Sequence, residues 1–199
     1  MEELKLINKR IAEAEKRIKE LVEDNSLKKL DDQEKYKISR FYENKSANRL
    51  QTAKLIFNNS TSQDYEDYSE VVSAAYYSMY YIVHAFLALK YKKKIKEEIR
   101  GIHAITHHLV LYYLVKTEKL AKHLYEEYIN TLETTAKIQK FNPEDYQKKA
   151  YNFAKSYQEQ KTRREVFTYY VSKNAERSQA EKSIKTAEEF IDTIKQVML

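Results

Sequence analysis

The hydrophobic positions along this 199-residue chain recur mainly at the spacing of α-helices. Near the start, apolar residues three and four positions apart alternate with Lys, Arg and Glu. This spacing predicts an amphipathic helix with one narrow apolar stripe. The stripe can pack against the rest of the chain or against a second chain, because its spacing alone does not separate these arrangements. Its members are Leu4, Ile7, Ile11, Ala14, Ile18 and Leu21.

The segment from about Tyr65 to Lys90 has a different pattern, since it is apolar on nearly all sides. A helix without a polar face must be enclosed by other helices, so we expect this one at the centre of the fold. The remaining pattern predicts a connector over residues 25–32 and further helices over about 36–57, 103–115, 118–140, 146–157, 164–170 and 178–199, with Asn142-Pro143 as a helix cap.

The composition supports helices over sheets. The chain has one Gly and one Pro, Gly101 and Pro143, where average usage would give about 14 and about 10. Tight hairpin turns draw on these residues, whereas helix interiors exclude them. We therefore predict an all-α fold, an up-and-down antiparallel helical bundle. Residues 1–32 form its N-terminal amphipathic helix and connector, and residues 33–199 form the bundle.

The charge balance is mildly basic. The chain holds 36 Lys and Arg against 30 Asp and Glu, a net charge of +6. This balance is compatible with nucleic-acid binding and equally with a solvent face covered by lysines. The absence of cysteine excludes disulfides and thiolate metal sites. The charged start Met1–Lys5 is unlike a signal peptide, and no apolar run approaches the roughly 20 residues of a membrane span. We expect a cytoplasmic protein outside the membrane.

The five histidines all lie between residues 84 and 123. His103 and His107 share a helix face at a spacing that suits a metal. However, Ala104 stands where a metalloprotease would carry its Glu, and the predicted helix has no carboxylate, so we expect no metal. His84 is expected to be a hydrogen-bonded core residue. Gly101 stands alone, which argues against a phosphate-binding glycine loop, and no cofactor is expected.

Tyrosines are abundant and often adjacent. The eighteen tyrosines include four doublets. Neighbouring helical residues point about 100° apart, so each doublet can bury one ring and leave the other near the surface. Most of these rings are expected to pack the core and its boundary, and exposed rings could stack on RNA bases. The doublets are Tyr76-Tyr77, Tyr80-Tyr81, Tyr112-Tyr113 and Tyr169-Tyr170.

Four segments together resemble the HEPN domain family. Ala75–Tyr81, followed by an apolar run, resembles the "AYYAMF" central helix of that family. Thr106-His107 resembles its "TH" element, Arg164–Tyr169 its late Arg-x4-Tyr segment, and Ala187–Ile191 its closing "A-x-E-F" helix. The order and spacing of the four agree over about residues 50–199.

The resemblance implies a four-helix core, a homodimer, and RNA cleavage within a toxin–antitoxin, phage-defence or CRISPR-linked system. A small nucleotidyltransferase is the expected partner protein. Catalytic members use an Arg followed after four to six residues by a His. Here Arg164 matches the Arg, and Tyr169 stands at the His position. A tyrosine with a pKa near 10 is a poor base at neutral pH.

Attack of a ribose 2′-hydroxyl on its phosphodiester needs a base and a fixed cation, but no metal. Three hypotheses follow. The chain is a metal-independent endoribonuclease in which Arg164 stabilises the phosphorane and Tyr169, Tyr170 or His107 handles protons. Alternatively, it is a non-catalytic binding or antitoxin module. The third hypothesis is a purely structural interaction protein. The candidate residues for holding nucleic acid, besides Arg164, are Lys161, Arg163 and Lys173.

Overall fold

The fold is known from a computed structural model, which describes residues 2–60, 68–96, 99, 101–139 and 175–199. The prediction of an all-α helical bundle is confirmed, with one small two-stranded sheet added. The predicted helices 146–157 and 164–170 and the Pro143 cap lie outside the described residues. The elements are α1 (Glu2–Glu23), β1 (Leu27–Lys29), α2 (Asp32–Asn59), α3 (Ser69–Tyr91), β2 (Lys93–Ile95), α4 (Ile102–Val110), the π-helix η1 (Leu111–Val115), α5 (Lys122–Ile138) and α8 (Arg177–Met198).

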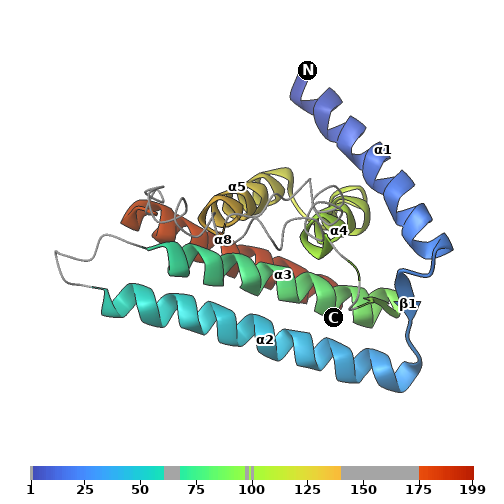
Figure 1. The fold of residues 1–199 in the computed structure, drawn as a ribbon, viewed down its shortest axis with the longest axis horizontal. Helices are drawn as coiled ribbons and strands as arrows, with labels where there is room; N and C mark the ends of the chain where they lie inside the picture. The colour runs from blue at the N-terminus through green and yellow to red at the C-terminus, as the bar shows by residue number, and fades with distance from the viewer. Residues whose placement is uncertain (1, 61–67, 97–98, 100, 140–174) are drawn as a thin grey trace, which may run out of the picture.

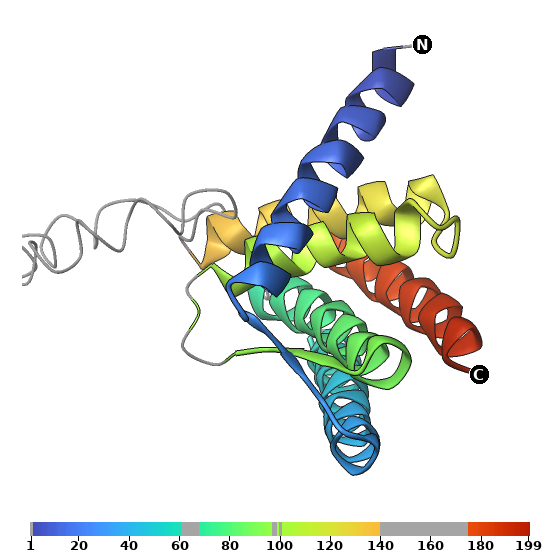
Figure 2. The same cartoon turned by 90° about the vertical axis from the view of Figure 1, so that its right-hand side faces the viewer.

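Helix α3 is the centre of the bundle, as its all-round apolar pattern predicts. Figure 2 shows α2, α8 and the pair α4 and α5 arranged around it. α2 runs antiparallel to α3, while α4 and α5 lie side by side across the other helices (Figures 1 and 2). Most of the rings and aliphatic side chains of α3 are buried, while Tyr77 and Tyr81 are half-buried. Burial on all sides accounts for a helix with no polar face.

Helices α2 and α3 approach through small residues. Ser39, Ser46 and Ala53, spaced seven apart, are the buried residues of α2. The Ser46 hydroxyl donates to the Ser78 carbonyl at 2.8 Å, which satisfies a buried polar group at this contact. α2 begins with a capping box, in which the Asp31 carboxylate accepts from the Glu34 backbone N–H at 2.7 Å. This cap fixes where α2 starts.

The N-terminal stripe packs against its own chain. Ile7, Ala14, Ile18 and Leu21 are buried, and α1 rests on α4 and η1. Lys116 after η1 forms an ion pair with Glu15 of α1 at 2.5 Å. The first part of α1 extends away from the bundle (Figure 1). The structure thus shows the first of the two arrangements that the spacing allowed.

The connector predicted over residues 25–32 contains a strand that the sequence did not reveal. β1 pairs antiparallel with β2, with Leu27 opposite Ile95, and both of these side chains are buried. Asn25 and Lys92 adopt positive φ angles of 57° and 49°, which turn the chain into each strand. Strands of three residues are too short to show the alternation by which a strand is recognised.

Two predicted helix boundaries also need correction. Glu118 has a φ of 57°, which ends regular helix there, so α5 begins at Lys122 and not near residue 118. The helix predicted over 103–115 divides into α4 and the π-helix η1. A shift from α to π hydrogen bonding leaves no mark in a hydrophobic pattern, because both forms keep the same face buried.

The expectation that no apolar segment is long enough for a membrane span is wrong for α3. Ser69–Tyr91 is long and apolar enough to cross a bilayer by length and composition. However, 89% of the apolar window is buried inside the protein by the other helices. The same apolar surface therefore serves as the core of the bundle.

Candidate functional site around His107

His107 is the one predicted catalytic residue that the structure describes. It is half-buried on α4, and its Nε2 lies 2.7 Å from the hydroxyl of Tyr125 on α5. The two rings stack at 5.8 Å between centroids. Arg10 of α1 lies close enough to Tyr125 to lower the pKa of its hydroxyl. The hydrogen bond between the Tyr125 hydroxyl and His107 Nε2 joins α5 to α4.

The surroundings of His107 keep it neutral. Burial lowers its pKa to about 3, and His108 and Arg10 add to this effect. Burial raises the pKa of Tyr125 to about 12, against the opposing influence of Arg10. A neutral imidazole of this kind is a weak base, but an anionic phosphate beside it would raise its pKa. At neutral pH the His107 imidazole and the Tyr125 phenol are therefore both uncharged.

His108 lines the same junction on the side of α1. Its ring stacks on His107 at 5.8 Å between centroids. Burial lowers the pKa of His108, Arg17 lowers it further, and Glu13 acts against them. Its buried Nδ1 has no hydrogen-bond partner within the described residues. Helix α1 thus contributes charged groups to the surroundings of both histidines.

A second set of histidines is built into the core. His84 is 3% exposed, and its Nε2 lies 3.0 Å from Thr106 Oγ1. The Thr106 hydroxyl donates to the Ile102 carbonyl, so His84 is the donor to Thr106. The prediction of a hydrogen-bonded core histidine is confirmed. His103 Nδ1 lies 2.8 Å from the Tyr76 hydroxyl.

The histidine pair considered for a metal is divided between two tyrosines. His103 bonds Tyr76 of α3, whereas His107 bonds Tyr125 of α5. Over the described ranges, no group of three or more His, Cys, Asp or Glu side chains is placed to hold a metal ion. In this arrangement the two imidazoles serve hydrogen bonding between helices.

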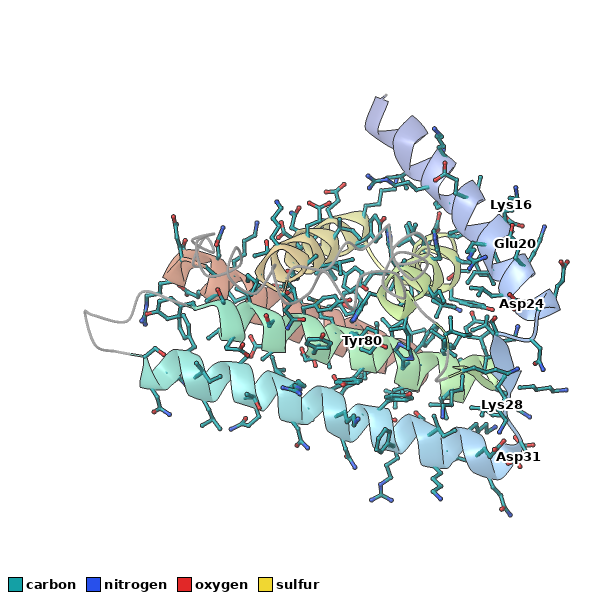
Figure 3. The ribbon with its side chains drawn as sticks, viewed as in Figure 1. Lys16, Glu20, Asp24, Lys28, Asp31 and Tyr80 are labelled. Atoms are coloured by element: carbon teal, nitrogen blue, oxygen red, sulfur yellow. The ribbon has the colours of Figure 1, made fainter. Side chains whose placement is uncertain are left out.

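Three of the four tyrosine doublets follow the predicted division between buried and exposed rings. Tyr76, Tyr80 and Tyr113 are buried, while their neighbours Tyr77, Tyr81 and Tyr112 are half-buried. Tyr80, labelled in Figure 3, lies on α3 within the bundle, and its ring is 4.4 Å from that of His84. The doublet Tyr169-Tyr170 lies outside the described residues.

Segments that carry the HEPN resemblance meet inside the bundle. Tyr76 of the α3 segment lies 6.0 Å from Tyr128, and Tyr128 stacks on Phe190 of the α8 segment at 5.3 Å. Thr106, of the third segment, contacts α3 through His84. Residues more than a hundred positions apart therefore share one aromatic core.

The other predicted site residues lie outside the described part of the chain: Arg164, Tyr169, Tyr170, Lys161, Arg163 and Lys173. Sequence reasoning missed Arg10 and Tyr125 as neighbours of His107. Their helices are far apart in sequence, and neither helix pattern carries a signal of which partner it meets.

One open cavity lined by described residues lies elsewhere. Its volume is about 490 Å³, and Leu89, Asp192 and Met198 are among its lining residues. It contains neither a histidine nor a tyrosine, so it adds nothing to the His107 group.

Comparisons with protein-family models, with curated proteins and with solved structures gave no significant match.

Proposed function

We propose that this chain is a HEPN-like protein of a toxin–antitoxin or defence system and that it binds RNA. One observation carries the proposal: the α3, α4 and α8 segments that resemble the family meet in one core. The Tyr76–Tyr128–Phe190 stack joins two of them, and the His84–Thr106 hydrogen bond joins the third. This convergence supports the view that the segments belong to one fold signature.

In its catalytic form, the protein is a metal-independent endoribonuclease. Arg164 stabilises the negative charge that develops on phosphorus, with the two-pronged geometry that a lysine lacks. Tyr169, Tyr170 or His107 handles the protons of the 2′-hydroxyl and the leaving group. The RNA backbone is held by three further cations, Lys161, Arg163 and Lys173.

The alternative is a non-catalytic module that binds RNA or a partner protein as an antitoxin would. The state of His107 favours it. Burial lowers the pKa of His107 to about 3, and its Nε2 is already engaged by the Tyr125 hydroxyl, so it is a weak base near neutral pH. Tyr169, at the motif position, is also a poor base near neutral pH. The ordinary pKa of a tyrosine lies near 10, so its hydroxyl stays protonated.

RNA cleavage in EDTA separates the two forms. The catalytic form predicts products that end in a 2′,3′-cyclic phosphate and that disappear in Arg164→Ala. The neighbouring Arg163→Ala is the matched control, with weaker binding but retained cleavage. RNA binding without cutting by the wild type supports the non-catalytic form. If the wild type neither binds nor cuts RNA, the RNA proposal is wrong.

The proposed partners need their own measurements. Light scattering on the purified chain tests the homodimer, which predicts twice the mass of one chain. Co-purification with a nucleotidyltransferase encoded beside it tests the proposed partner protein. Cell fractionation tests the cytoplasmic location, which recovery in the membrane fraction would contradict.

A further inference from the structure

The outward side of α2 carries side chains that packing does not explain. α2 lies at the edge of the bundle, and its side chains project from that edge into open space (Figure 3). Its buried residues are all small. Yet three of the five large hydrophobic residues exposed in the described ranges lie on this helix: Tyr36, Phe41 and Leu55.

The same helix is strongly basic. Between Lys35 and Lys54 it carries six basic residues and a single acidic one, Glu43. Lys35 is ion-paired with Asp32 at 2.9 Å, and Lys54 with Glu188 at 2.5 Å. The other four basic residues form no ion pair within the described part of the chain: Lys37, Arg40, Lys45 and Arg49.

Two of these cations lie against aromatic rings. Lys45 Nζ is 4.6 Å from the ring centroid of Phe41 and 5.3 Å from that of Tyr81. The Arg49 guanidinium carbon is 5.9 Å from the ring centroid of Tyr77. Tyr77 and Tyr81 are the half-buried rings of the α3 doublets, 6.3 Å apart. We call these five residues the aromatic–cation row.

We propose that the aromatic–cation row, with Arg40 next to Phe41 in the chain, is the docking surface for single-stranded RNA. Unpaired bases stack on the exposed ring of Phe41, and Arg40, Lys45 and Arg49 contact the phosphates. That the ligand is RNA rests on the proposed function. The location of the surface rests on α2 and α3 alone.

Charge complementarity selects this occupant. A second copy docked on this surface by a two-fold axis would place one set of cations opposite the same set of the partner, and the like charges repel. A membrane surface requires a helix whose apolar side is separate from its charges. On α2 a cation lies directly over an exposed ring, since Lys45 Nζ is 4.6 Å from the ring centroid of Phe41. A single nucleic-acid strand offers both bases for the rings and phosphates for the cations.

The sheet before α2 is also basic. Lys28 stands opposite Lys94 and Lys29 opposite Lys93 in the β1–β2 pairing. Like charges in directly opposed positions destabilise a strand pair. Lys28 is held by Glu34 at 2.9 Å, whereas Lys29 and Lys93 have no ion pair within the described residues. A bound polyanion would relieve this repulsion.

Binding of a labelled single-stranded oligouridine, followed by fluorescence anisotropy, tests the surface. Phe41→Ala should weaken binding roughly 5- to 100-fold, as expected for the loss of one base–ring stack. Phe41→Trp should keep the affinity. Leu55→Ala is the matched control, because both side chains are 52% exposed on one helix but an aliphatic side chain cannot stack. Its affinity should equal that of the wild type.

Salt dependence tests the cations separately. For a single strand, the slope of log K against log salt falls by about 0.7 for each phosphate that the protein no longer neutralises. Arg40→Gln combined with Lys45→Gln should therefore reduce the slope by about 1.4. Lys16→Gln combined with Lys137→Gln removes the same charge from exposed positions on α1 and α5 and should leave the slope unchanged. Circular dichroism confirms that each variant is folded.

The outcomes distinguish this surface from RNA binding in general. If the wild type binds oligouridine and the α2 variants bind equally well, the surface is wrong while the proposed function stands. If the wild type binds no RNA, both proposals are wrong. Duplex RNA that competes as well as the single strand overturns base stacking. If the wild type binds phosphatidylserine vesicles but no RNA, and the same α2 variants lose vesicle binding, the surface binds lipid instead.

Discussion

Aromatic residues on α3 and on the outward side of α2 are alike in chemistry but differ in their surroundings. On α3, Tyr76 is fully buried, and its hydroxyl is satisfied by His103. On α2, the ring of Phe41 is 52% exposed, and its close neighbour is a lysine ammonium. The first ring stabilises the fold by removing apolar area from water. The second has little to contribute to folding, which leaves it available for the proposed RNA contact.

This difference also explains how α2 holds its place. Its contact with α3 depends on small residues that allow close approach, together with the Ser46–Ser78 hydrogen bond. The large side chains of Tyr36, Phe41 and Leu55 are left exposed, whereas others on α2, such as Tyr42 and Phe57, pack partly buried against the core. Stability and binding are expected to separate along the helix, with each residue acting in one role.

The largest effect is expected from the same substitution made in the two environments. Phe190 is fully buried against Tyr128, and Phe190→Ala should reduce the free energy of unfolding by about 3–5 kcal/mol. Phe41→Ala should change it by no more than about 0.5 kcal/mol. Urea unfolding measures both. Equal losses of stability would show that the Phe41 ring is part of the core and that the two rings have the same role.

A second pair of variants examines the small-residue contact. Ala53 is fully buried, so Ala53→Leu must push α2 from its neighbours and should cost about 1–3 kcal/mol. Ala47, earlier on the same helix, is exposed, and Ala47→Leu should leave the unfolding free energy nearly unchanged. Thermal or urea unfolding measures the difference. If Ala53→Leu is tolerated, close approach does not hold α2 in place.

Much more of the buried region than of the exposed one could be predicted from the sequence. The central position of α3 and the core role of His84 follow from a run of apolar residues that no exposed helix could carry. The neighbours of His107 could not be predicted, because Tyr125 and Arg10 meet it only through packing of α1, α4 and α5. The β1–β2 sheet was missed because its strands have three residues each.

The aromatic–cation row also could not be predicted from the sequence. Its members alternate between α2 and α3, and nothing in either helix indicates that Lys45 lies between Phe41 and Tyr81. The doublets did predict that one ring of each pair would lie near the surface, and Tyr77 and Tyr81 are the half-buried members. Arg164 and its neighbours stay predictions, because they lie outside the described residues.

The buried region should also show a pH dependence that the exposed one lacks. Burial lowers the pKa of His84 from 6.5 to about 3. Below pH 6.5 the unfolded chain therefore binds a proton that the folded protein refuses, so stability falls as the pH falls towards 3. This residue should account for a loss of about 1–2 kcal/mol between about pH 7 and pH 5.

His84→Gln keeps a donor for Thr106 but cannot titrate, so its stability should fall less steeply with decreasing pH. His103 and His107 still titrate, since burial lowers their pKa values to about 4 and about 3. The exposed His123→Gln is the control and should follow the wild-type profile. Urea unfolding across this pH range measures all three proteins. An unchanged slope in His84→Gln would contradict burial as the cause.

The smallest effect on folding is expected from Arg40→Gln combined with Lys45→Gln. The Lys45 ammonium no longer lies over Phe41, an interaction worth about 0.5–1 kcal/mol at an exposed site. Removing two neighbouring positive charges from α2 relieves their repulsion with Lys37 and Arg49, which acts in the opposite direction. The unfolding free energy should therefore stay within about 0.5 kcal/mol of the wild type. A loss well above this value in urea unfolding would mean that the row holds α2 to α3, and weaker RNA binding in this variant would then report a damaged fold. A retained stability together with the reduced salt slope would place the two roles on different residues of one helix.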